Sequence, residues 1–204
     1  PLVLYLSNLG IKNIGIVDDD KVDMSNLNRQ ILFNTKDIGK FKVIQAKKFL
    51  QKVNKMLKIN TYKLKIIKKN VQNILSKYDI ICDCSDNFTT RYLLNDFCLK
   101  NKKILISAAI NKFEAHVFNF NFSKKIPCYR CFMPEIPGEE DKCDAEGILP
   151  TVAGIAGTLQ ANEVVKSILG KKDELVGKMI VFNTLSLNFR IIKLTRNADC
   201  IMGC

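Results

Sequence analysis

The chain has 204 residues, of which 47% are hydrophobic and 25% charged, which is enough for one domain with a real core. It contains no apolar run of about 18 residues that could span a membrane and no recognisable secretory leader. The net charge of +12 is almost all lysine and is spread over many elements, without an arginine-rich stripe. We therefore expect neither nucleic acid nor a membrane as partner.

Eight cysteines without secretory signals favour reduced thiols, metal ligation or catalysis over a disulfide framework. This thiol usage favours a cytoplasmic protein, although an organellar address could lie upstream of Pro1.

The first predicted elements alternate between helix and strand. Pro1 and Gly10 flank LVLYLSNLG as the start and stop signals of a helix, and the β-branched segment KNIGIVD that follows reads as a buried strand. Further along, we predict a helix over 41–56, strands over 61–67 and 78–84, and a helix over 87–100.

The second half is richer in strands. We predict a strand at ILISAA (104–109), an alternating pair around 113–122, a long loop over 123–149, a helix over 150–169 stopped by Gly170, and strands over 178–183 and 187–195. This order predicts an α/β fold with a Rossmann-like doubly wound sheet, mainly parallel with an antiparallel extension, plus a zinc-binding loop region.

The stretch IVDDDKVDMSNLNRQ, residues 16–30, gathers carboxylates at the end of a strand in a basic chain. In open α/β sheets, ligands bind beyond the carboxyl ends of the strands, and an acid after the second strand typically holds ribose hydroxyls. Asp18 occupies that place. The alternative is that Asp18 to Asp20 simply cap a loop.

Phosphate and metal ligands can be predicted nearby. Asn26, Asn28, Arg29 and Lys42 offer donors to phosphate oxygens. A second strand ends in DCSDN, which would present Asp83 and Asp86 at the same sheet edge, and such a carboxylate could hold Mg²⁺ on a triphosphate.

The cysteines fall into different classes. Cys128 and Cys131 form C-x-x-C in the long loop, and a second pair, Cys200 and Cys204, lies at the far end. Two such pairs suit a closed tetrahedral zinc site, with free thiols as the alternative. The other cysteines that we assign to the core are Cys82, Cys84 and Cys98.

Five motifs occur in order along nearly the whole chain: DDDKVDMSNLNRQILF, IGKFKV, CDCSDNFTTRYLLND, PCYRCF and LPTVAGIAGTLQANEVVKSILG. Together they resemble the ubiquitin-activating-type adenylyltransferases, closest to MoeB, ThiF and the activators of Urm-type sulphur carriers. The resemblance implies that ATP and Mg²⁺ are used to adenylate the C-terminal glycine of a small ubiquitin-like protein ending in Gly-Gly, with release of pyrophosphate.

The resemblance also implies site residues. Asp18 would bind ribose and Asp86 the metal, and Arg29, Lys42 and Asp86 would be catalytic. The full set that we expect to contact the nucleotide and its metal is Asp18, Asp20, Ser25, Asn26, Asn28, Arg29, Lys42, Asp86 and Asn87. In the resembling enzymes the second cysteine pair is also C-x-x-C, whereas here it is C-x-x-x-C, so the fourth zinc ligand, Cys204, stays open.

Cys143 matches a position where some family members carry a thiol that receives an acyl group or a persulfide, although neighbouring acids would raise its pKa. We expect residues 1–204 to form a single adenylation domain whose glycine-rich loop lies upstream of Pro1, and to act as a homodimer. Three alternatives remain: a modifier-activating enzyme with a thioester at Cys143, a non-catalytic subunit of a heterodimeric activator, and a nicotinamide-dependent oxidoreductase.

Overall fold

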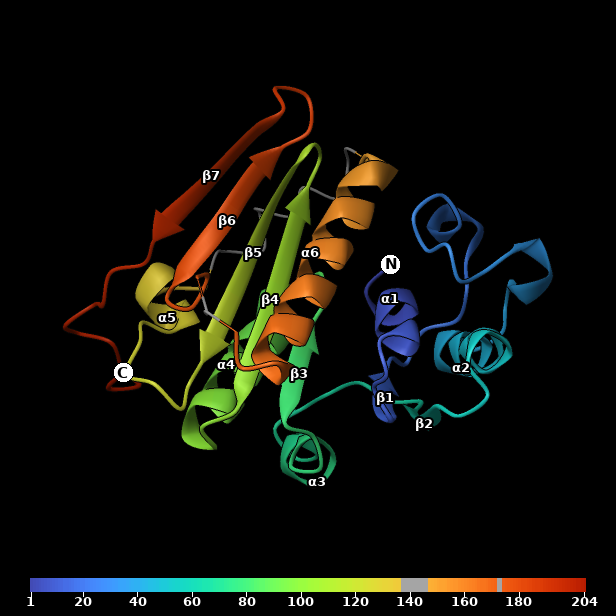
Figure 1. Ribbon diagram of the computed structural model, residues 1–204, viewed down its shortest axis with the longest axis horizontal. Coiled ribbons are helices and arrows are strands. Elements are labelled where there is room, and N and C mark those ends of the chain that lie inside the picture. The colour runs from blue at the N-terminus through green and yellow to red at the C-terminus, as the bar shows by residue number, and fades with distance from the viewer. Residues whose placement is uncertain (137–146, 172–173) are drawn as a thin grey trace. The chain divides into compact units, whose positions relative to one another are not determined.

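The computed structural model describes residues 1–136, 147–171 and 174–204. It divides into two compact units, Pro1–Ile66 and Ile67–Cys204, and each is described by itself (Figure 1). No helix within the described ranges is long and apolar enough to cross a bilayer.

Unit 1 holds a two-stranded parallel sheet. Its elements are α1 (Leu2–Asn8), β1 (Asn13–Val17), the 3-10 turns η1 (Met24–Asn26) and η2 (Thr35–Asp37), α2 (Lys42–Val53) and β2 (Lys58–Tyr62). β1 and β2 pair in register from Asn13 opposite Lys58 to Val17 opposite Tyr62. The buried core comes from both layers, with Leu6, Ile14, Val43, Leu50 and Ile59 among its members.

Two helix ends and one strand test the expected boundaries. Gly10 and Gly170 follow α1 and α6 (Pro150–Ile168) with φ of +77° and +59°, the left-handed conformation that favours glycine after a helix. The strand expected over 61–67 is wrong in position, because the strand here is Lys58–Tyr62. Its place is set by the pairing with β1, which the period-2 pattern of 61–67 does not reveal.

Unit 2 is a five-stranded sheet with helices on both faces. In chain order it contains α3 (Val71–Leu75), β3 (Ile80–Asp83), α4 (Phe88–Lys100), β4 (Ile104–Asn111), β5 (Glu114–Asn121), α5 (Tyr129–Phe132), α6, β6 (Lys178–Asn183) and β7 (Asn188–Lys193). The strand order is β3-β4-β5-β6-β7. β3 and β4 are parallel, and the remaining pairs are antiparallel.

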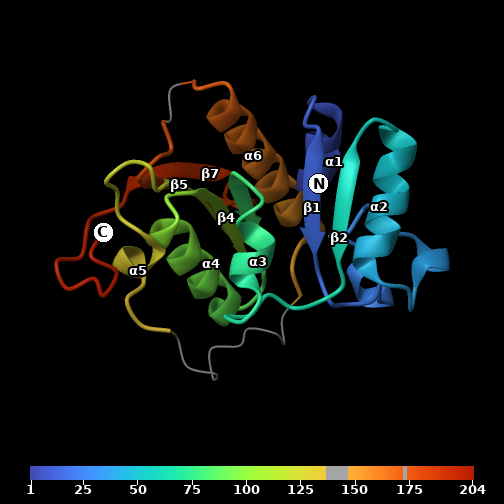
Figure 2. The ribbon, with the colours of Figure 1, turned by 90° about the horizontal axis from the view of Figure 1, so that it is seen from below.

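The alternation of β5 explains the three layers of unit 2 (Figure 2). Ala115 and Val117 pack with Val152 and Ala156 of α6 in one buried cluster. Phe118 points to the opposite face, where its ring lies 5.6 Å from that of Tyr129 in α5. Successive strand residues face opposite sides, so β5 supplies apolar side chains to both helical layers.

The predicted α/β class is confirmed, with parallel pairing early in the chain and an antiparallel extension later. The short helices α3 and α5, of five and four residues, were not predicted, because they are too brief to establish a helical period.

Candidate functional site

The acid-rich turn, Asp18–Arg29 of unit 1, is organised by its own side chains. Asp23 caps η1, accepting from the backbone N–H of Ser25 at 2.8 Å and from its hydroxyl at 2.7 Å. Asn26 completes a capping box by accepting from the N–H of Asp23 at 3.3 Å. This reciprocal capping fixes the backbone that carries the predicted phosphate ligands.

Arg29 is held within the same turn. Its Nη1 donates to the carbonyl of Ser25 at 3.0 Å and to Oδ1 of Asn28 at 3.1 Å. A guanidinium has five N–H donors, so donors beyond these two contacts are left for an anion. The turn therefore orients the cation and keeps capacity for phosphate oxygens.

Lys42 opens α2, where a cation faces the positive end of the helix dipole. Its Nζ contacts Oδ2 of Asp20 at 2.7 Å, and its side chain is 11% exposed while that of Asp20 is 66% exposed. The backbone N–H of Lys42 also donates to the carbonyl of Asp20 at 3.0 Å. Asp20 thus compensates the buried ammonium and brings it to the acid-rich turn.

Asp18 is half-buried and accepts the N–H of Asp20 at 2.8 Å. Burial raises the pKa of Asp18 above its ordinary value, although that N–H and the ammonium of Lys42 act in the opposite direction. The carboxylates of Asp18, Asp19 and Asp20 lie within 4.8 Å of one another.

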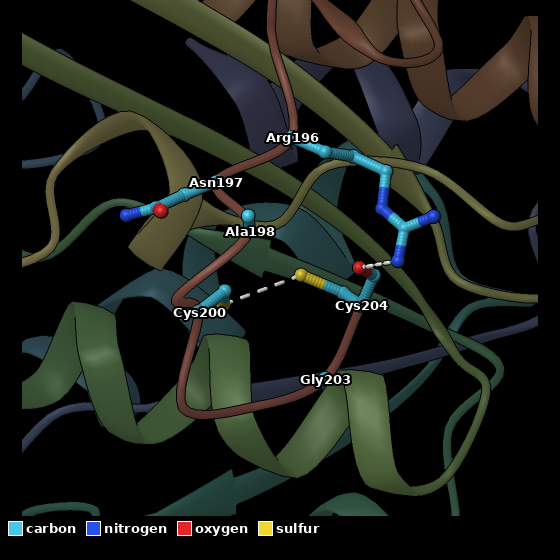
Figure 3. Close-up of a pocket in the computed structure, with 6 residues that line it drawn as sticks. All are labelled: Arg196, Asn197, Ala198, Cys200, Gly203 and Cys204. Atoms are coloured by element: carbon cyan, nitrogen blue, oxygen red, sulfur yellow. Dashed lines mark hydrogen bonds between the residues drawn. The ribbon is translucent and has the colours of Figure 1, made fainter.

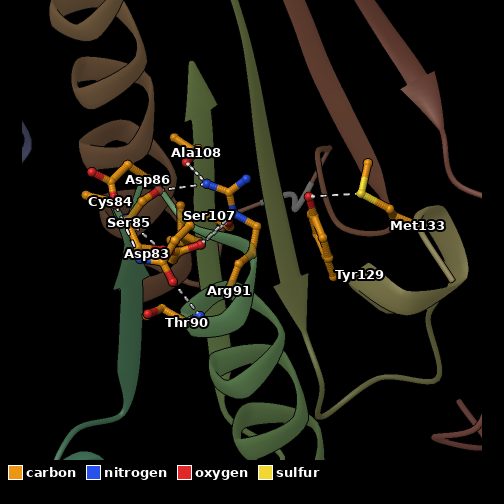
Figure 4. A network of polar contacts seen from close by, with 12 residues as sticks. Asp83, Cys84, Ser85, Asp86, Thr90, Arg91, Ser107, Ala108, Tyr129 and Met133 are labelled. Atoms are coloured by element: carbon orange, nitrogen blue, oxygen red, sulfur yellow. Dashed lines mark hydrogen bonds and ion pairs between the residues drawn. The ribbon is translucent and has the colours of Figure 1, made fainter. Parts of the chain in front are cut away.

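The Asp86 turn, Asp83–Asn87 of unit 2, does not present both of its acids. Asp83 is buried, and its carboxylate accepts from Nε of Arg91 at 3.2 Å and from Oγ of Ser107 at 2.6 Å (Figure 4). The expectation that Asp83 faces a ligand is therefore wrong: it balances the buried Arg91, since a buried charge needs a partner.

Arg91 reaches back over the turn that follows β3. Its Nη2 donates to the carbonyl of Ser85 at 2.8 Å and to that of Ala108 at 3.2 Å. The motif CDCSDNFTTRYLLND contains this arginine eight residues after Asp83, but no local pattern in the sequence assigns it a role.

Asp86 is exposed and lies directly before α4. Asn87 caps this helix by accepting the N–H of Thr90 at 2.9 Å, and its Nδ2 donates to Oδ1 of Asp86 at 3.3 Å. A carboxylate is the hard oxygen ligand that Mg²⁺ prefers, so the exposed Asp86 fits the metal role expected of it.

The four predicted cysteine ligands come together. The Sγ atoms of Cys128, Cys131, Cys200 and Cys204 lie within 4.8 Å of one another. Three of the separations are 3.7 Å for Cys128 and Cys200, 3.2 Å for Cys131 and Cys204, and 3.4 Å for Cys200 and Cys204. Figure 3 shows the last of these contacts. A tetrahedral zinc with bonds of about 2.3 Å has sulfur–sulfur edges of about 3.8 Å, so this cysteine cluster could bind zinc.

The C-x-x-x-C spacing does not keep Cys204 out of the cluster. The chain turns back between the two cysteines, with the N–H of Gly203 donating to the carbonyl of Cys200 at 2.9 Å and Gly203 at φ +64°. Arg196 donates to the carbonyl of Cys204 (Figure 3). The additional residue is accommodated by this turn.

The cysteine cluster is attached to α4 by polar contacts. Arg130 donates to both carboxylate oxygens of Asp96, at 2.8 and 2.7 Å. The buried Asn95 accepts the N–H of Tyr129 at 2.8 Å. The first turn of the short helix α5, within the C-x-x-C segment, is therefore anchored to α4.

Of the remaining thiols, Cys98 is buried as expected, whereas Cys82 is half-buried and Cys84 is exposed. The core assignment of Cys84 is wrong, because the residue belongs to the turn after β3 and not to the strand. Cys143 lies outside the described residues.

The sequence of this chain matches the ThiF family model over residues 1–202. It is 39% identical over 204 residues to the Culex quinquefasciatus protein named adenylyltransferase and sulfurtransferase MOCS3, covering 98% of this chain and 46% of that protein. It is 35% identical over 206 residues to the sulfur carrier protein adenylyltransferase of Thermus thermophilus, covering 98% of this chain and 76% of that protein.

The probable molybdopterin-synthase adenylyltransferase of Porphyra purpurea is 41% identical over 197 residues, with 95% of this chain and 51% of that protein covered. This chain spans about half the length of several of these curated relatives.

The fold also matches a solved structure. The E. coli MccB crystal structure described with ATP aligns with a TM-score of 0.85 and 22% identity over 100% of this chain and 62% of that one. That likeness shows the fold, whereas the sequence match over nearly the whole length shows the family. On this basis the chain belongs to the ThiF family.

Proposed function

We propose that this chain activates a small ubiquitin-like or sulphur-carrier protein by adenylating its C-terminal glycine at the expense of ATP. The proposal is supported by the family, by the adenylyltransferase names of the relatives, and by the T. thermophilus relative, whose name specifies a sulfur carrier protein. The observation that carries it is the acid-rich turn, which holds Arg29 and Lys42 in place beside carboxylates.

The chemistry needs charge neutralisation more than a base. A glycine carboxylate is already ionised at neutral pH, so it can attack the α-phosphorus of ATP without losing a proton, and pyrophosphate leaves. The reaction then depends on cationic donors that stabilise charge on the phosphate oxygens. Arg29 and Lys42 would supply these donors, with the amides of Asn26 and Asn28 nearby.

The other expected ligands have separate roles. Asp18 would accept hydrogen bonds from ribose hydroxyls, while Asp20 keeps Lys42 in place and Ser25 belongs to the capped turn. Bound Mg²⁺ would neutralise phosphate charge, and Asp86, oriented by Asn87, would be its protein ligand. Zinc at the cysteine cluster would be structural, since four thiolates leave no open coordination position.

The test is ATP–pyrophosphate exchange by the whole protein, with candidate carriers that end in Gly-Gly. We expect exchange that requires one carrier and is abolished in Asp86→Ala. Asp79→Ala is the matched control, because Asp79 is an exposed carboxylate before the other end of β3, and it should exchange normally. If no carrier supports exchange although ATP binds, the chain is a non-catalytic subunit.

Cys143→Ala separates the two catalytic readings. We expect exchange to persist in this variant, which would confine the thiol to a later transfer of sulphur or acyl group. If a carrier thioester forms and disappears in Cys143→Ala, activation of a modifier for conjugation is favoured instead. Sedimentation of the whole protein tests the proposed homodimer.

A further inference from the structure

Gln160 is a buried polar residue in the middle of helix α6. It is 1% exposed, and its side chain meets the sheet at the last residue of β3 and at Ile106 within the parallel strand β4. Nε2 donates to the carbonyl of Asp83 at 2.9 Å and to that of Ile106 at 3.2 Å. Because both acceptors are carbonyls, the amide orientation is fixed, with Nε2 toward the strands.

The other end of the amide contacts the Asp86 turn. The thiol of Cys84 donates to Oε1 of Gln160 at 3.4 Å. One side chain thus binds the last residue of β3, its neighbour strand β4, and the first residue after β3. Burying an amide costs free energy unless it is hydrogen-bonded, and here the donors and the acceptor are all used.

Core packing alone does not explain why residue 160 is a glutamine. The residues of α6 that fill the core are small or aliphatic, such as Val152, Ala156, Ala161 and Val164. Leucine has a similar size and would bury apolar surface without a desolvation penalty. The polar end of Gln160 therefore serves to orient the backbone that it binds.

The same backbone is held from the opposite face of the sheet. Ser85 donates to the Asp83 carboxylate through its N–H at 2.9 Å and its hydroxyl at 2.6 Å, and its carbonyl accepts from Arg91. Figure 4 shows Cys84, Ser85 and Asp86 following Asp83 in this network. Arg91 from α4 and Gln160 from α6 enclose a stretch of chain that ends at the exposed Asp86.

We propose that Gln160 is a positioning residue that fixes the Asp86 turn and thereby the carboxylate offered to the metal. This inference rests on the proposed function. Misplacement of a reacting group by about 1 Å can cost about a hundredfold in rate. Loss of the amide releases the Asp83 carbonyl and the Cys84 thiol, so the Asp86 carboxylate loses its fixed place without being removed.

The test compares Gln160→Leu and Gln160→Glu with Glu163→Gln in the whole protein. Leucine removes the donors and keeps the volume, while glutamate keeps the shape but turns a carboxylate toward two carbonyl oxygens. Glu163 is the control because it is buried one turn later in α6 and binds Asn119 at 3.0 Å and Lys166, away from the Asp86 turn. All three variants disturb buried polar contacts of α6. An effect that appears only in the two Gln160 variants is therefore specific to the contacts of Gln160.

The decisive measurement is the Mg²⁺ dependence of pyrophosphate exchange. Both Gln160 variants should need about tenfold or more Mg²⁺ for half-maximal exchange and should lose about ten- to a hundredfold in maximal rate. Glu163→Gln should keep the wild-type Mg²⁺ requirement. Amide hydrogen exchange should be faster over residues 84–88 in the Gln160 variants and not in Glu163→Gln.

The outcomes separate the two proposals. Absence of exchange in the wild type with every carrier refutes the proposed function. Wild-type exchange together with an unchanged Mg²⁺ requirement in Gln160→Leu refutes only the positioning role, as does a shift of equal size in Glu163→Gln.

Discussion

The acid-rich turn and the Asp86 turn both follow a parallel strand and both contain acids, but they are held in different ways. In the acid-rich turn the capping contacts and those of Arg29 join residues one to four positions apart. In the Asp86 turn the contacts of Asp83 reach 8, 24 and 77 positions along the chain. Apart from the pair of Asp20 with Lys42, 22 positions away, the first turn is held by local contacts, whereas the second depends on tertiary packing as well.

This difference separates the residues that we propose bind the nucleotide from those with a structural role. Asp20 pairs with Lys42 but is 66% exposed, whereas the carboxylate of Asp83 is 0% exposed beside Arg91. We therefore expect changes to the locally held side chains to affect binding more than stability, and changes to the buried pair to affect stability more than binding.

The largest effect is expected at the cysteine cluster, which joins parts of the chain over 70 residues apart. The protein should carry about one zinc per chain, and each of Cys128→Ser and Cys204→Ser should lose it, with a large fall in the unfolding temperature. Elemental analysis measures the metal. Cys84→Ser is the control and should retain zinc; retention in Cys204→Ser would show that the fourth ligand is another group.

The next effect concerns the buried ion pair. Asp83→Asn keeps the shape but leaves Arg91 buried without a balancing charge, and should lower the free energy of unfolding by about 3–5 kcal/mol. Asp20→Asn also removes the acid beside a buried cation, but Asp20 is 66% exposed and solvent screens this ion pair, so the loss should be smaller, about 1 kcal/mol. Urea unfolding of both variants measures the difference, and equal losses would contradict the contrast between the two turns.

We expect Arg29→Ala to reduce activity while leaving stability nearly unchanged. Its contacts are local, so the free energy of unfolding should change by less than about 0.5 kcal/mol. Loss of charge-assisted hydrogen bonds to phosphate should reduce pyrophosphate exchange by about ten- to a hundredfold. Lys52→Ala, an exposed cation on α2, should leave exchange intact; a similar loss there would point to general charge rather than a specific contact.

The smallest effect is expected from the pH dependence at Asp18. Burial raises the pKa of Asp18, so the folded state disfavours its carboxylate, and this penalty on stability appears as pH rises from the ordinary pKa through the raised one. Asp18→Asn lacks the penalty. Its free energy of unfolding relative to wild type should therefore be higher at pH 7 than at pH 3, as measured by urea unfolding; the opposite trend would sink this account of Asp18.

The same contrast explains what the sequence could reveal. The helix ends at Gly10 and Gly170 and the cysteine pairs depend on short spacing, and they were predicted. Pairing of β2 with β1 was missed because register depends on a partner strand.

The candidate site follows the same rule. Asp18 and Arg29 stand in a contiguous motif that points to nucleotide binding, whereas Gln160 resembles any polar residue on a helix until the sheet beneath it is known. The burial of Asp83 could have been suspected from Arg91, eight residues later, but only the fold brings Ser107 and the carbonyl of Ala108 to the same place.

Helix α4 connects the Asp86 turn with the cysteine cluster. Its 13 residues begin shortly after Asp86 and, through Asn95 and Asp96 in their second half, hold the C-x-x-C segment. A helix of this length is a rod of about 20 Å. A tilt of this helix after loosening of the cysteine cluster would also move Asp86 at its N-terminal end, so zinc bound by the four thiols would help to fix the position of that carboxylate.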